Sequence, residues 1–142
     1  MRISIGNDHA GVDYKKYIQE YLFVKEVEVK NYGADSLESV DYPDFAHPVS
    51  QDVNDQSSDL GILICGSGNG VCMTANKYEK VRAALCWNKE LAKLSKSHNN
   101  ANIVCIPARF VDKEQALEIV KTFISENFEG GRHERRVNKI SK

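Results

Sequence analysis

The sequence has no hydrophobic run long enough to cross a membrane. A membrane-spanning helix needs about 18 or more consecutive apolar residues, and charged or polar side chains interrupt every apolar stretch here much earlier. Residues 1–6 lead directly into Asn7-Asp8-His9 and lack the apolar core of a secretory signal. We therefore expect a cytoplasmic protein that does not bind membranes.

Cysteine is scarce, and neither sign of charge dominates. The chain has four cysteines, Cys65, Cys72, Cys86 and Cys105. Their spacing lacks the short pairs typical of zinc sites, and their density does not suggest a disulfide scaffold. We expect free thiols and no metal site. The formal net charge is -1, so nucleic acid is not an expected partner and any anion must be recognised by a local cluster.

Internal repeats, low-complexity tracts and linkers are also missing from the sequence. The 142 residues include 27% charged and 42% hydrophobic side chains, which is typical of a folded globular protein. This length suits one domain. We expect a single domain over residues 1–142, with residues 130–142 as a basic C-terminal tail.

Apolar, β-branched segments alternate with longer segments of helical period. This alternation predicts an α/β fold with a parallel sheet. We predict five strands, over residues 2–6, 27–31, 60–65, 81–87 and 102–107. The third and fifth are nearly continuous hydrophobic runs, as expected of strands that helices cover on both faces.

The clearest predicted helix follows the fifth strand. Asp112 is expected to cap its start with Gln115 as the capping-box partner, and Gly130-Gly131 to close its end. Its apolar side chains, at steps of three and four, are Ala116, Leu117, Val120, Phe123, Ile124 and Phe128. The same period marks an earlier helix through Tyr14, Tyr17, Ile18, Tyr21 and Leu22. Further helices are predicted over residues 43–53, 69–77 and 88–97.

Glycine is concentrated after the third strand, in Cys65-Gly66-Ser67-Gly68-Asn69-Gly70. A tight turn leading into a helix would aim several backbone amides at one point, with the positive end of the helix dipole behind them. Such a loop could hold a phosphate or the oxyanion of an enediolate. A glycine turn that merely connects strand to helix remains an alternative.

The familiar glycine motifs do not match this loop. A Walker loop needs a lysine, and none follows Gly70. Val71 stands where a dinucleotide-binding loop needs its third glycine, and where a cysteine phosphatase needs an arginine.

Cys65 is the cysteine most suited to chemistry, because amides and a helix N-terminus stabilise a thiolate. Cys86 and Cys105 lie in predicted strands and Cys72 in a predicted helix, so these three are expected to be small buried hydrophobes.

Polar side chains follow three of the predicted strands. Asp8 and His9 come after the first, Cys65 after the third, and Arg109 after the fifth. Because the carboxyl ends of parallel strands share one edge of a sheet, these groups are expected to lie near one another. His98, flanked by Asn99 and two more asparagines, is a candidate acid/base partner for Cys65. His47, in a helical stretch, is expected to be an ordinary surface residue.

The tail is locally basic. If it is helical, Arg132 and Arg136 share one face, and two guanidiniums at that spacing suit a phosphate monoester. A solvated basic tail or a nucleic-acid contact is the alternative, and the overall charge and the lack of an extended basic stripe weigh against nucleic acid.

Together these residues resemble a known family, the type B ribose-5-phosphate isomerases, which are grouped with galactose- and allose-phosphate isomerases. The resemblance spans nearly the whole chain. It rests on Gly6-Asn7-Asp8-His9-Ala10-Gly11, Asp41-Tyr42-Pro43, Cys65-Gly66-Ser67-Gly68-Asn69-Gly70, Ala75-Asn76-Lys77, His98-Asn99 and Gly130-Gly131-Arg132-His133. It implies a Rossmann-like three-layer sandwich and interconversion of ribose 5-phosphate and ribulose 5-phosphate in the pentose phosphate pathway, without metal or organic cofactor.

The resemblance also implies roles for individual residues. Cys65 matches the base that moves a proton between C2 and C1, and His98 the proton donor that opens the sugar ring. Matches to substrate-binding residues are Asp8, Ser67 and Asn99 for sugar oxygens, Tyr42 for the pocket wall, and His9, Arg109, Arg132 and Arg136 for the phosphate. The amides of Gly66, Ser67, Gly68, Asn69 and Gly70 match the hole for the enediolate oxygen.

Some members of this family carry glycine at position 65 and a glutamate base at position 71. This chain has Cys65 and Val71, so it is similar to the cysteine-based type. The family is usually dimeric, with each pocket completed by the neighbouring subunit, and sometimes tetrameric. An allose- or galactose-6-phosphate isomerase, a non-catalytic sugar-phosphate sensor and a thiol-dependent phosphatase remain as alternatives.

Overall fold

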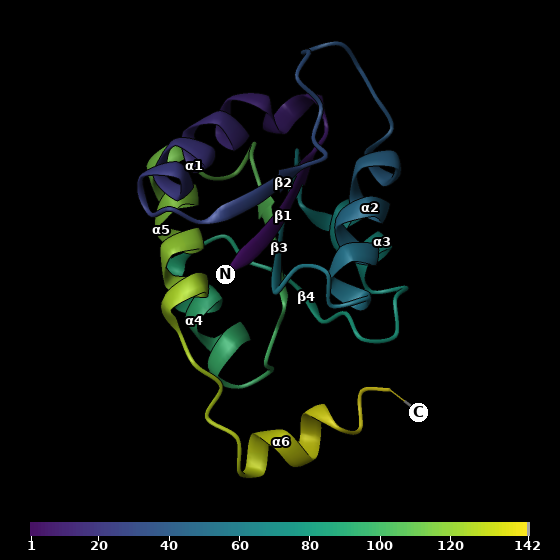
Figure 1. Ribbon diagram of the computed structural model, residues 1–142, viewed down its shortest axis with the longest axis vertical. Helices are drawn as coiled ribbons and strands as arrows, with labels where there is room; N and C mark the ends of the chain where they lie inside the picture. Colours follow the sequence, from purple (N-terminus) through teal and green to yellow (C-terminus); the bar gives the residue numbers. More distant parts are fainter. Residues whose placement is uncertain (142) are drawn as a thin grey trace.

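A computed structural model describes residues 1–141 of the chain (Figure 1). At its centre lies a five-stranded sheet with the order β2-β1-β3-β5-β4. The strands are β1 (Arg2–Asn7), β2 (Glu28–Asn31), β3 (Leu60–Cys65), β4 (Ala83–Leu85) and β5 (Ile103–Pro107). Every neighbouring pair is parallel. The predicted α/β fold with five parallel strands is confirmed.

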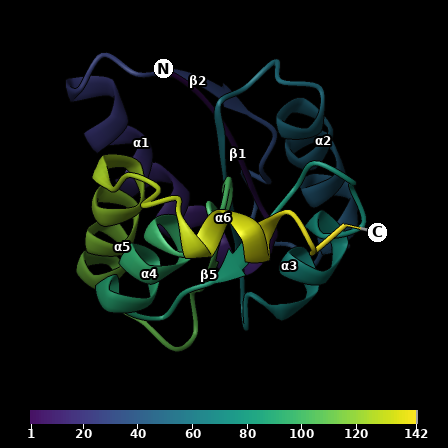
Figure 2. The ribbon, with the colours of Figure 1, turned by 90° about the horizontal axis from the view of Figure 1, so that it is seen from below.

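Helices cover both faces of this sheet. They are the 3-10 helix η1 (His9–Gly11) and the α-helices α1 (Val12–Val24), α2 (Tyr42–Asn54), α3 (Asn69–Ala75), α4 (Lys89–Ser97), α5 (Lys113–Ser125) and α6 (Arg132–Val137). Helices α1, α4 and α5 pack together on one face, and α2 and α3 on the other (Figure 2). The result is the three-layer sandwich that the resemblance implied. Within residues 1–141, no helix is both long enough and apolar enough to span a membrane.

Alternation along β3 assigns its side chains to the two faces. Ile62 and Ile64 belong to the apolar cluster under α1, α4 and α5, whereas Leu63 and Cys65 belong to the cluster under α2 and α3. This follows from the two-residue period of a strand. It brings Cys65 to the end of the strand on the side of α3.

Some predicted boundaries are wrong, and those of α5 and β4 differ most. The capping box of Asp112 and Gln115 is present, but α5 ends at Ser125, because Glu126 is extended, with φ -80° and ψ 149°. Gly130 and Gly131 do not close α5. Their positive φ values, 68° and 57°, turn the chain into α6 instead. Strand β4 is also shorter than predicted, since only residues 83–85 pair with β5.

The strand order changes direction at the neighbouring strands β1 and β3: β2 lies beyond β1 on one side of the sheet, and β5 and β4 lie beyond β3 on the other. In such sheets ligands bind outside the carboxyl ends of the strands, at this switch point. We call this side of the sheet the carboxyl edge and the opposite side the amino edge. Helix α6 crosses below the amino edge (Figures 1 and 2).

Candidate active site

The loop after β3 folds back on the thiol of Cys65. The amide of Gly68 donates a hydrogen bond to Sγ of Cys65 at 3.1 Å, and Cys65 is 4% exposed. Gly68 has a φ of +73°, and a Cβ added there would lie 2.4 Å from Cδ1 of Leu85. Both facts require glycine. The loop therefore supplies a main-chain donor to the sulfur, as a stabilised thiolate needs.

The other two loop glycines allow large side chains to approach closely. A Cβ on Gly66 would lie 3.1 Å from Nη1 of Arg109, and the amide of Arg109 donates to the carbonyl of Gly66 at 3.0 Å. A Cβ on Gly70 would lie 2.4 Å from Cζ of Tyr42, at the start of α2. An arginine and a tyrosine thus lie directly against the loop, while Ser67 and Asn69 are exposed on it.

Asp8 and His9 follow β1 at the same edge. The amide of Asp8 donates to the carbonyl of Ile64 at 3.2 Å, next to Cys65. The carboxylate of Asp8 accepts from the amide of Ala10 at 2.9 Å, which fixes the start of η1. Nδ1 of His9 accepts from the amide of Val40 at 3.3 Å. The carboxyl edge therefore carries a carboxylate, an imidazole, a thiol, a phenol and a guanidinium around one loop.

His98 and Asn99 lie elsewhere. Helix α4 runs antiparallel to the strands, so the segment after it is at the amino edge, where the amide of Asn102 donates to the carbonyl of Arg82 at 3.0 Å. Arg132 and Arg136 are exposed on α6, below that edge (Figure 2). A single chain does not bring His98, Asn99, Arg132 or Arg136 to Cys65. The predicted site residues form two groups at opposite edges of the sheet.

The amino-edge group includes two side chains for which the sequence predicted no role. The rings of His98 and His133 are stacked, with centroids 4.1 Å apart and planes 10° apart. The carboxylate of Glu129 lies 3.9 Å from Nε2 of His98 and 3.4 Å from Nε2 of His133. The only signal for His133 was its place in the Gly130-Gly131-Arg132-His133 segment.

These three side chains are the group in residues 1–141 that comes closest to a metal site, since one ligand atom from each lies within 4.8 Å of the others. A metal ion binds in the plane of an imidazole, along the nitrogen lone pair. The near-parallel rings direct their lone pairs side by side rather than toward one point. The arrangement fits a shared carboxylate better than a shared metal ion.

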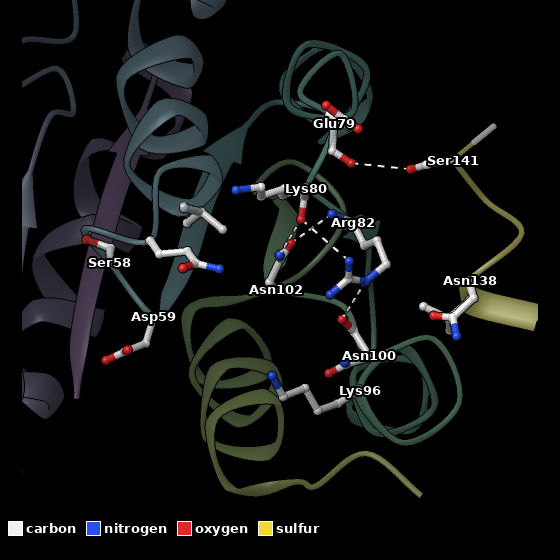
Figure 3. A pocket seen from close by; sticks show the side chains of 13 residues that line it. Ser58, Asp59, Glu79, Lys80, Arg82, Lys96, Asn100, Asn102, Asn138 and Ser141 are labelled. Carbon is white, nitrogen blue, oxygen red and sulfur yellow. Dashed lines mark hydrogen bonds between the residues drawn. The ribbon is translucent and has the colours of Figure 1, made fainter. Parts of the chain in front are cut away.

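A cavity of about 760 Å³ also lies at the amino edge (Figure 3). Its two most buried cations satisfy main-chain carbonyls: Nε of Arg82 donates to Asn100 at 2.9 Å, and Nζ of Lys96 to Ala101 at 3.2 Å. Burial lowers the pKa of Arg82, and burial together with the charge of Arg82 lowers the pKa of Lys96. Cations suit this edge because α4 ends there with its carbonyls exposed. None of the predicted site residues lines this cavity in the described part of the chain.

A smaller cavity of about 430 Å³ adjoins the glycine loop at the carboxyl edge. Its lining combines Ser67 and Asn69 of the loop with apolar side chains. Two of these are largely open to solvent: Trp87 is 53% and Phe110 74% exposed. Neither residue was among the candidates predicted from the sequence. They leave an exposed apolar surface beside the glycine loop.

The other three cysteines differ in burial and in pKa, and Cys86 and Cys105 are unsuited to acid/base chemistry. Burial raises the pKa of Cys86 to about 11 and also raises the pKa of Cys105. Both are buried free thiols, as predicted. Cys72 is only half-buried, contrary to the prediction, and its Sγ lies 3.4 Å from the carbonyl of Ala83. A hydrogen bond with Cys105 lowers the pKa of Cys72 despite its burial.

Comparison with known proteins connects this geometry to a family. A family model described as Ribose/Galactose Isomerase matches residues 3–140. The chain belongs to the ribose/galactose isomerase family. Within that family it is 39% identical to ribose-5-phosphate isomerase B of Escherichia coli strain K12 over 140 residues, which cover 99% of this chain and 94% of that protein.

Solved structures of family members share the whole fold. The chain superimposes on a ribose 5-phosphate isomerase from Thermotoga maritima with a TM-score of 0.95 and 48% identity, covering 99% of this chain and 97% of the other. It also superimposes on ribose-5-phosphate isomerase B from Mycoplasma genitalium, a structure with bound ribulose-5-phosphate, with a TM-score of 0.94 and 47% identity over 98% of this chain and 93% of the other.

Proposed function

We propose that this chain is an aldose–ketose isomerase that interconverts ribose 5-phosphate and ribulose 5-phosphate through a cis-enediolate. The observation that carries the proposal is the Cys65 thiol, held 3.1 Å from the amide of Gly68 at the switch point of the sheet. The relative from Mycoplasma genitalium, 47% identical and solved with ribulose-5-phosphate, supports the same substrate. Because that reaction belongs to pentose phosphate metabolism, we place the protein in the cytoplasm.

The chemical step is a proton transfer between neighbouring carbons. The Cys65 thiolate removes the proton from C2 of the open-chain aldose, the C2–H electron pair forms the C1–C2 double bond, and the carbonyl pair moves to O1. Amides of residues 66–70 bind the negative oxygen as it develops. The thiol then returns the proton to C1 while the proton of the O2 hydroxyl passes to O1, which leaves a C2 carbonyl and a C1 hydroxyl and gives the ketose. One electron pair is rearranged within the substrate, so the balance requires no metal or redox cofactor.

Ring opening precedes this step. The C1–O4 bond breaks as O4 receives a proton from His98 and the C1 hydroxyl releases its proton to solvent. Asp8, Ser67 and Asn99 hold sugar oxygens, and Tyr42 lines the pocket. The phosphate is bound by His9, Arg109, Arg132 and Arg136. Anchoring this remote group orients the reacting carbons.

We infer that each pocket is shared by two copies of the chain. One copy supplies Cys65, Asp8, His9 and Arg109 from its carboxyl edge, and the other supplies His98, Asn99 and the α6 arginines from its amino edge. A two-fold dimer would build two such pockets, and a tetramer would be a pair of these dimers. Two features support this arrangement: α6 projects below the body of the chain (Figure 1), and Trp87 and Phe110 are exposed beside the loop.

The test of this function is the substitution Cys65→Ala. Removing a placed base should lower turnover of ribose 5-phosphate by about a hundred- to ten-thousandfold, with little change in KM. Cys72→Ala is the matched control, because it removes another thiol that is only half-buried. It should keep wild-type turnover. Near-normal turnover in Cys65→Ala would refute the mechanism. Parallel assays with allose 6-phosphate would distinguish the two sugar specificities.

A further inference from the structure

His98 is held by two neighbours that the proposed mechanism does not use. Its ring lies against that of His133, 4.1 Å away and nearly parallel. The carboxylate of Glu129 faces Nε2 of both rings, at 3.9 Å for His98 and 3.4 Å for His133. One face of the His98 ring is therefore covered, and one of its nitrogens points toward a negative charge.

The segment after α5 positions Glu129 and His133 next to His98 through backbone hydrogen bonds. The amide of Glu129 donates to the carbonyl of Ser97 at 3.0 Å, which ties this segment to the end of α4 next to His98. Gly130 and Gly131, both with positive φ, then reverse the chain so that α6 begins at once. The amide of His133 donates to the carbonyl of Gly130 at 3.1 Å. These contacts fix Glu129 and His133 relative to His98.

Burial differs sharply among the three side chains. The side chain of His133 is 9% exposed, whereas those of His98 and Glu129 are 37% and 58% exposed. His133 is thus a buried support, and His98 is the imidazole that can reach a ligand.

We propose that Glu129 and His133 are positioning residues that hold the imidazole of His98 ready for ring opening. This inference rests on the proposed function. Glu129 orients Nε2 of His98, and the His133 ring fixes the plane in which His98 presents its other nitrogen. Neither residue touches the substrate.

Burial and the charges around the cluster favour the neutral form of His133. Burial lowers the pKa of His133, and the neighbouring His98, Arg132 and Arg136 lower it further, against the opposite effect of Glu129. His133 is therefore neutral near pH 7, where it can share the carboxylate without competing for a second proton. The carboxylate of Glu129 therefore faces a neutral His133 ring and the more exposed ring of His98.

The experiment separates ring opening from the carbon chemistry. Ribose 5-phosphate is largely cyclic, whereas ribulose 5-phosphate stays open because its O5 carries the phosphate. Turnover of ribose 5-phosphate measures both processes. Exchange of the C1 proton of ribulose 5-phosphate with D2O, followed by NMR, measures enediolate formation at Cys65 alone.

Three variants are compared with the wild type. Glu129→Gln keeps the shape of an exposed side chain and removes its charge, and His133→Phe keeps a flat ring and removes its nitrogens. Glu134→Gln, which removes the charge of an exposed glutamate next to His133 on α6, is the matched control. We expect turnover of ribose 5-phosphate to fall roughly tenfold or more in Glu129→Gln, while C1 exchange stays within about twofold of wild type. His133→Phe should likewise lower turnover of ribose 5-phosphate much more than C1 exchange. The control should change neither rate.

Equal losses of turnover and exchange in Glu129→Gln would indicate a merely structural role and overturn the inference. Unchanged turnover would overturn it as well. Both outcomes require an active wild type. A wild type that neither isomerises ribose 5-phosphate nor exchanges the C1 proton would instead refute the proposed function, so the two failures can be told apart.

Discussion

At the residue scale, Arg136 is suited to binding and not to chemistry. It is exposed on α6, one helical turn after Arg132, and it carries no group that could move a proton at neutral pH. Arg136→Ala should therefore raise KM and leave turnover at saturation nearly unchanged. The expected loss of binding is about 1.5–3 kcal/mol, the usual scale of a hydrogen bond between charged partners.

Arg135→Ala supplies the control for this prediction. Arg135 is equally exposed and adjacent in sequence, but it lies on a different face of α6. Its removal takes away the same charge and should leave KM close to that of the wild type. If both substitutions raise KM equally, the positive charge of α6 attracts the phosphate in general, and Arg136 is not a specific phosphate ligand.

Asp52 is a second residue with a measurable individual effect, on stability. Its carboxylate accepts hydrogen bonds from Ser4 at 2.7 Å, Tyr32 at 3.0 Å and Lys30 at 3.2 Å. Burial alone would raise its pKa, but these bonds and one from Ser57 lower it overall. A lowered pKa in the folded state stabilises the fold above the unfolded value, about 3.9, and this contribution disappears as pH falls through the folded value.

Asp52→Asn should therefore lower the free energy of unfolding by about 1.5–3 kcal/mol at pH 7. The difference from wild type should shrink as the pH is lowered below about 4. Urea denaturation at several pH values measures both effects. A deficit that stays constant with pH would contradict the assignment to the charged carboxylate.

At the element scale, the glycine loop is shaped by its neighbours. A Cβ at position 70 would lie 2.4 Å from the Tyr42 ring, so Gly70→Ala should force the ring away and cost about 1–3 kcal/mol of stability by overpacking. Thermal or urea denaturation measures the cost. If the clash is the cause, the double variant Gly70→Ala/Tyr42→Ala should be no less stable than Tyr42→Ala alone. A further loss in the double variant would place the strain in the backbone of the loop.

The elements themselves were largely predictable, for identifiable reasons. The bounds of β3 were predicted correctly because Leu60–Cys65 is a continuous apolar run between polar segments. The capping box of α5 was readable because a side-chain cap depends on two nearby residues. The end of α5 was not, because the amide of Glu129 bonds to Ser97, far back in the sequence. Such long-range contacts leave no local signal.

At the scale of the whole molecule, the chemical roles suggested for individual residues were easier to predict than their relative positions in the fold. Cys65 and Arg109 follow strands, and the structure puts them at one edge, as predicted. His98 follows a helix. In a parallel sheet the segment between a helix and the next strand lies at the amino edge, so local chemistry alone could not join His98 to Cys65 within one chain. The pocket that we propose to be shared by two copies of the chain would bring the two groups together.

The most direct test of this account mixes two inactive partners. In a dimer with shared pockets, one chain bearing Cys65→Ala and one bearing His98→Asn form one pocket with both residues intact and one with neither. Random mixing of equal amounts, by co-expression or by refolding together, should restore about a quarter of the wild-type turnover of ribose 5-phosphate. Turnover no higher than the average of the two separate variants would show that both residues act within one chain, and would contradict the shared site.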